Sequence, residues 1–85
     1  MKNIIITQWL RPDRKRAEIF AQVPDELHGK AMLLDISCEQ IDEQHAAIYA
    51  HVKGGSEEDE RSEIAELGSK TNGPQQALER LINRF

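Results

Sequence analysis

The sequence predicts a two-layer α+β domain in which two helices cover one face of a mostly antiparallel sheet. Most of the chain alternates apolar and polar residues with a period of two, which is typical of half-buried strands. Two segments instead space their apolar residues by three and four, as a helix does. The expected order is β-β-α-β-β-β-α in a single domain, 1–85, because a chain of 85 residues has room for only one small core.

The first two strands are expected at 3–10 and 17–23. The first is rich in Ile, Thr and Trp and is apolar on both faces, whereas the second alternates apolar and polar residues. Between them, Pro12 and Asp13 favour a turn. The two strands should therefore form a hairpin with a strongly basic tip made of Arg11, Arg14, Lys15 and Arg16.

A short helix is expected at 24–33, because Pro24 suits the first helical position and carboxylates favour the first turn. Alternation over 34–39 and 45–52, around a polar turn, predicts a second hairpin with Leu34, Ile36 and Cys38 facing the core. An acidic, flexible loop should follow, and then a short strand at 61–67 that closes the sheet.

The final helix begins after the turn residues Asn72-Gly73-Pro74. Its apolar residues lie on one helical stripe, and polar residues cover the other side. The stripe consists of Ala77, Leu78, Leu81, Ile82 and Phe85.

Charge is distributed unevenly along the chain, which carries a formal net charge of −4. Residues 1–30 contain six Lys and Arg against four Asp and Glu, residues 31–68 two against ten, and residues 69–85 three against one. An acidic balance argues against a general nucleic-acid binder. No apolar run is long enough to span a bilayer, the start does not resemble a signal peptide, and the lone Cys38 cannot form an internal disulfide. We therefore expect a cytoplasmic protein with no membrane partner.

Candidate catalytic and metal-binding residues are few. His45 and His51 would share a strand face, but six strand residues set them roughly 20 Å apart, too far for one metal ion. Neither Cys38 nor Ser37 lies in a nucleophile elbow, and the paired carboxylates lie in turns where solvation is the default. The sequence predicts no catalytic residue, no metal site and no cofactor.

Three features are candidates for binding a partner. The first is the basic tip. The second is an outward strand face carrying Trp9, Phe20 and Tyr49 and extending to His51, where we expect Trp9 to serve an interface and Phe20 to belong to a core. The third is acidic and could imitate a nucleic-acid backbone in a basic groove of another protein. It comprises Glu57, Glu58, Asp59 and Glu60 with the neighbouring Glu63 and Glu66.

Two segments, Ile5-Ile6-Thr7-Gln8-Trp9-Leu10-Arg11-Pro12-Asp13 and Thr71-Asn72-Gly73-Pro74, resemble small proteins of phages and prophages. Those proteins open with an Ile-Thr-Gln-aromatic-Leu strand that leads into Pro-Asp-Gly-Arg, and carry Asn-Gly-Pro before a final helix. This chain has Arg14 where the similar proteins have Gly. The resemblance implies a phage origin and a role as a stoichiometric modulator of a host machine, such as an inhibitor of bacterial immunity.

The hypothesis is therefore a non-enzymatic interaction protein that binds a host protein through Trp9, Tyr49 and the basic turn, with the acidic residues reaching a basic groove. The alternative is a nucleic-acid-binding accessory protein that uses the basic turn for phosphates and Trp9 for stacking. Homodimerisation through an exposed edge strand or the aromatic face is also open.

Overall fold

The computed structural model describes residues 1–10, 15–68 and 73–85. Strands and helices follow one another in the predicted order, so the α+β class is confirmed. They are β1 (Lys2–Leu10), β2 (Lys15–Val23), α1 (Asp25–Ala31), β3 (Leu34–Gln40), β4 (His45–Val52), the 3-10 turn η1 (Glu57–Asp59), β5 (Arg61–Glu66) and α2 (Gly73–Asn83).

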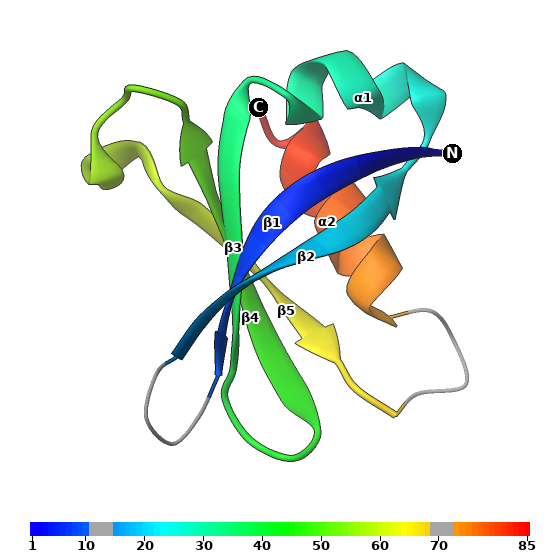
Figure 1. The fold of residues 1–85 in the computed structure, drawn as a ribbon, viewed down its shortest axis with the longest axis vertical. Coiled ribbons are helices and arrows are strands. Elements are labelled where there is room, and N and C mark those ends of the chain that lie inside the picture. The colour runs from blue at the N-terminus through cyan, green and yellow to red at the C-terminus, as the bar shows by residue number, and fades with distance from the viewer. Residues whose placement is uncertain (11–14, 69–72) are drawn as a thin grey trace.

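The five strands form one sheet in the order β2-β1-β3-β4-β5 (Figure 1). Neighbouring strands are antiparallel except for β1 and β3, which are parallel. Strand β2 returns the chain to the end of the sheet where β1 begins, and α1 then carries it past β1 to the start of β3, which therefore runs parallel to β1. Pro24 is the N-cap of α1 and not its first helical residue, and the helix ends at Ala31, two residues earlier than expected.

Both helices pack on one face of the sheet, as predicted. The strand pairing places apolar side chains from β1, β3 and β4 on that face, where they meet the apolar stripe of α2. The larger core residues are Ile4, Ile6, Val23, Leu34, Ile36, Ile48, Leu78, Leu81 and Ile82. None of the helices in the described part of the chain is long and apolar enough to cross a membrane.

Three arginines form contacts between the end of α2 and β5. The Arg84 guanidinium donates to the Ser62 carbonyl oxygen at 2.9 Å and lies 3.2 Å from a Glu63 carboxylate oxygen, and Arg80 Nε lies 3.6 Å from the other. Arg61 donates to the Arg84 carbonyl oxygen and stacks over the Phe85 ring. These contacts cover the outer edge of β5 with helix side chains.

Candidate interaction face

Neither helix of the described residues lies over the second face of the sheet (Figure 1). The register aligns Glu18 of β2 with Thr7 of β1, and Thr7 with Ser37 of β3. The same row continues through Tyr49 of β4 to Ser62 of β5. A band of hydroxyl groups therefore crosses this face, which we call the open face.

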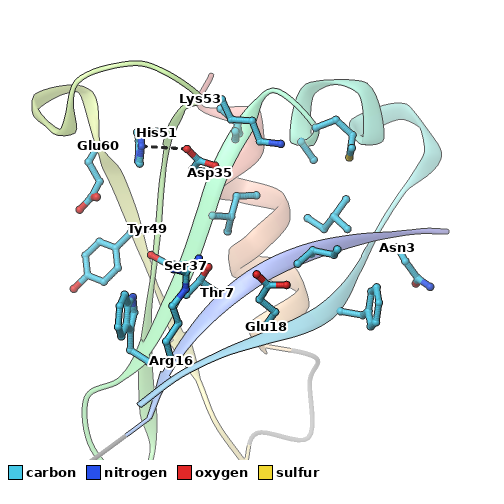
Figure 2. A pocket seen from close by; sticks show the side chains of 18 of the residues that line it. Asn3, Thr7, Arg16, Glu18, Asp35, Ser37, Tyr49, His51, Lys53 and Glu60 are labelled. Atoms are coloured by element: carbon cyan, nitrogen blue, oxygen red, sulfur yellow. Dashed lines mark ion pairs between the residues drawn. The ribbon is translucent and has the colours of Figure 1, made fainter. Parts of the chain in front are cut away.

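A groove of about 1050 Å³ lies on the open face where β1 and β3 part (Figure 2). The two strands pair only from Thr7–Ser37 to Trp9–Glu39, although β1 pairs with β2 over its whole length. Towards the N-terminus of β1 the ribbons diverge, and Leu34 and Ile36 line the opening together with the end of α1. The groove thus reaches down to the apolar core.

Apolar side chains flank one side of this groove. Ile5 and Phe20 are directly opposed on β1 and β2 and are 60% and 74% exposed, and Met32 is also exposed at the end of α1. The expectation that Phe20 belongs to a core is wrong, because no helix or strand of residues 1–10, 15–68 and 73–85 covers the open face beside β2. We call Ile5, Phe20 and Met32 the apolar flank.

Trp9 and Tyr49 lie on the open face and line the same groove, so the structure brings these two predicted residues to one surface. Both are half-buried. Sequence reasoning missed Ile5 as a surface residue because it lies in a continuous Ile run. Its odd-numbered position, shared with Thr7 and Trp9, was the available signal.

Among the residues that the structure describes, carboxylates outnumber cations around the groove. Four acidic side chains line it, Glu18, Asp35, Glu39 and Glu60, against Arg16 and Lys53. Asp35 also forms a cross-strand ion pair with His51, with 3.5 Å between Oδ2 and Nε2 (Figure 2). The combination of apolar flank and acidic lining fits a cationic partner better than a polyanion.

The predicted basic tip is divided by the structure. Lys15 and Arg16 belong to β2, where they pair with Leu10 and Trp9, so their assignment to the turn is wrong. Strand pairing continues further than Pro12 and Asp13 suggested. Arg16 reaches the open face beside Trp9, whereas Arg11 and Arg14 lie outside the described residues.

The acidic segment is also divided. Residues Glu57–Asp59 form a 3-10 turn, where sequence alone suggested only a flexible loop, and the Ser56 hydroxyl accepts from the Glu58 amide at 3.1 Å. Glu58, Asp59 and Glu60 are exposed, and Glu60 reaches the groove. Glu63 instead faces α2 and is paired with two arginines, so it does not belong to an outward acidic surface.

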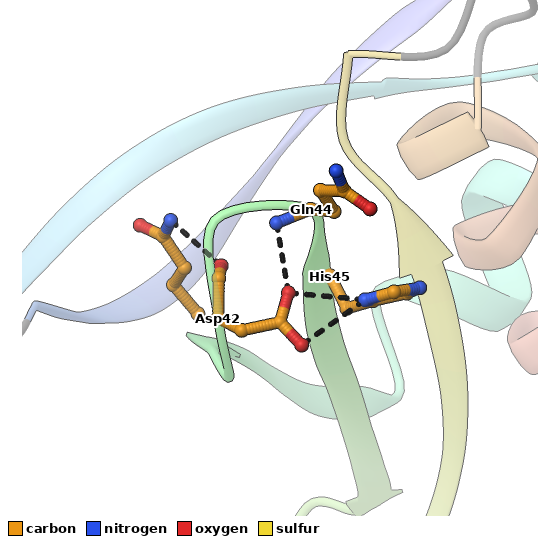
Figure 3. A network of polar contacts seen from close by, with 4 residues as sticks. Asp42, Gln44 and His45 are labelled. Atoms are coloured by element: carbon orange, nitrogen blue, oxygen red, sulfur yellow. Dashed lines mark hydrogen bonds and ion pairs between the residues drawn. The ribbon is translucent and has the colours of Figure 1, made fainter.

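Histidine and aspartate organise the turn between β3 and β4 (Figure 3). Asp42 Oδ1 accepts from the Gln44 amide at 2.8 Å, and both carboxylate oxygens lie within 3.1 Å of His45 Nδ1. The amide of Gln44, followed by the His45 ring, lowers the pKa of Asp42. In the part of the chain that the structure describes, no three His, Cys, Asp or Glu side chains form a group that could hold a metal ion.

Cys38 packs against the core on the helix-covered face, as its alternation predicted. Burial raises the pKa of its thiol. A raised pKa keeps the group protonated at neutral pH, and the thiolate is the nucleophilic form. This environment gives Cys38 no activation.

Comparison with known proteins finds no matching family model, no matching curated protein and no matching solved structure.

Proposed function

We propose that this chain is a non-enzymatic interaction protein of phage or mobile-element type that binds a host protein in the bacterial cytoplasm and modulates or inhibits it. The observation that carries the proposal is the open face, where exposed apolar side chains border a groove that reaches the core. Contiguous apolar surface rimmed by polar groups marks partner-binding sites.

Side-chain types on the open face support a protein partner. Aromatic residues are enriched at the centres of interfaces, and Trp9, Tyr49 and Phe20 come from three different strands of this face. The acidic lining favours a partner segment rich in Lys or Arg, because potentials of opposite sign steer association. A bacterial immunity protein that holds nucleic acid in a basic groove would present such a segment.

The test is affinity capture from a bacterial lysate treated with nuclease, using wild type and a Trp9→Ala/Tyr49→Ala variant. An Ile5→Ser variant tests the same face without removing a half-buried ring, and Leu33→Ala, which truncates an exposed side chain in the turn between α1 and β3, is the matched control. We expect one protein to be captured by wild type and the control and lost in both open-face variants. Capture that is equal in all four would refute the assignment of the open face.

One observation favours a second candidate function, which is binding of single-stranded nucleic acid. Arg16 lies opposite Trp9 on the open face of the sheet, and an aromatic ring beside a cation is the arrangement that stacks bases and contacts phosphates. Affinity for a single-stranded oligonucleotide should then fall steeply with salt and be lost in a Lys15→Ala/Arg16→Ala variant. Binding that is absent at low salt would exclude this function.

A further inference from the structure

The two outer strands of the sheet, β2 and β5, differ in how far other parts of the chain cover their free edges. At β5, the Arg84 guanidinium donates a hydrogen bond to the Ser62 carbonyl oxygen. The backbone of Gly73 also lies so close to Glu66 that a Cβ added at Gly73 would be 2.5 Å from the Glu66 carbonyl oxygen. At β2, no backbone hydrogen bond from a loop, turn or cap within the described residues reaches positions 16–22. The edge of β2 is the one available for another strand.

Strand β2 has the regularity that strand addition requires. All nine of its residues pair one to one with β1, from Lys15–Leu10 to Val23–Lys2, so the strand contains no bulge. It also contains no proline. A long, regular edge is a template for pairing with another chain unless something blocks it. Lys15 and Arg16 are edge-blocking residue types, and both lie at the first end of the strand.

The side chains of β2 select the partner strand and its register. If two β2 strands pair antiparallel with the two-fold axis at Arg16 or at Glu18, that charged residue faces its own copy, and like charges are opposed. With the axis at Ile19, Glu18 of one copy faces Phe20 of the other. Centring on Ala17 pairs Arg16 with Glu18 but overlaps only positions 15–19 within the described strand.

Centring on Phe20 overlaps positions 17–23 and places no like charges opposite each other. It opposes the two Phe20 rings, which are the most exposed large apolar side chains of the described residues, and it opposes Ile19 with Ala21 twice on the other face. Cross-strand aromatic pairs are among the stabilising contacts of antiparallel sheets.

We propose that two copies of this chain associate through antiparallel pairing of their β2 strands about Phe20, which forms a continuous ten-stranded sheet. The occupant of the edge is a second copy, because the register about Phe20 is self-complementary. The two open faces then lie side by side on one surface of the dimer and double the area offered to a partner. The proposed dimer does not depend on which partner the open face binds.

The first test is sedimentation equilibrium of purified protein over a wide concentration range. We expect a monomer–dimer equilibrium, and Phe20→Glu should raise the dissociation constant by about tenfold or more, because two carboxylates would then face each other across the two-fold axis. Ile64→Glu is the matched control, since Ile64 is 51% exposed on the other outer strand and should leave the constant unchanged. A monomer at every concentration would overturn the proposal.

The second test fixes the register by disulfide trapping in a Cys38→Ser background. Phe20→Cys should form a disulfide-linked dimer on mild oxidation, because directly opposed strand residues lie within the Cα separation that a disulfide spans. Glu18→Cys should not, since four strand residues of offset set the two thiols roughly 13 Å apart. Equal cross-linking at both positions, or cross-linking at position 18 alone, would contradict the register.

Discussion

Phe20→Ala on a dilute, monomeric sample is the most direct test of whether the open face is open. Fully burying a Phe side chain is worth about 1.5–3 kcal/mol, and Phe20 is 74% exposed, so only about a quarter of that free energy is at stake. We therefore expect the free energy of unfolding to fall by about 0.4–0.8 kcal/mol. That loss is small beside the roughly 4–13 kcal/mol expected for a chain of this length.

The matched comparison is Leu81→Ala on the helix-covered face. Leu81 is fully buried between α2 and the sheet, so the substitution leaves a cavity and should cost about 2–5 kcal/mol. Urea unfolding followed by far-ultraviolet circular dichroism measures both values on the same scale. Protein concentration must lie where sedimentation shows a monomer, because dimerisation would add to the apparent stability.

A Phe20→Ala loss above about 2 kcal/mol in the monomer would refute the reasoning. Such a loss would mean that the Phe20 ring is buried by an element of its own chain, and the apolar flank would then be core. A small loss for Phe20 together with a large loss for Leu81 supports the assignment of one face to folding and the other to binding.

Four further outcomes follow from particular contacts. Gly73→Ala should lower the free energy of unfolding by about 1–3 kcal/mol in urea titrations, because its Cβ would collide with the Glu66 carbonyl oxygen; an unchanged midpoint would contradict this. Glu63→Gln should cost about 0.5–1 kcal/mol, an effect that high salt reduces, since two arginines lose their shared carboxylate. The pKa of Asp42 is lowered in the folded state, so its carboxylate stabilises the fold above the unfolded-state pKa, and this stabilisation disappears as pH falls through the folded-state pKa. The difference in free energy of unfolding between wild type and Asp42→Asn should therefore be largest at neutral pH and vanish in acid. Alkylation of Cys38 by iodoacetamide at neutral pH should be slow in the folded protein and accelerate in urea. A fast rate in the folded protein would show an activated thiol and would support an enzymatic function.

The elements could be predicted from sequence because each depends on local periodicity. The hairpins follow from alternation, and α2 follows from apolar residues spaced by three and four. Strand alternation also placed Trp9 and Tyr49 on one side, since side-chain direction repeats every two residues. What alternation does not reveal is whether a loop covers the outward face, and for that reason the expectation that Phe20 belongs to a core is wrong.

The remaining errors arise from contacts between distant parts of the chain. Glu63 carries the same local signal as its acidic neighbours, and its pairing with Arg80 and Arg84 depends on the path of α2 across β5. The groove likewise depends on where the parallel strands β1 and β3 stop pairing, which no local pattern encodes. Lys15 and Arg16 have no strong preference against strands, so pairing with Leu10 and Trp9 decided their conformation.

The composition of the open face argues that it does more than face water. A sheet face that is merely solvated would be polar along every strand, as antiparallel sheets with one wet face usually are. Here large apolar side chains are opposed across β1 and β2, at Ile5 and Phe20, beside an opening into the core, while carboxylates line the same groove. Apolar surface next to a charged rim is the arrangement of an interface, in which the first supplies affinity and the second selects the partner. Charge reversal of rim residues such as Glu39 should therefore slow association with a basic partner, whereas truncation of Ile5 should accelerate dissociation.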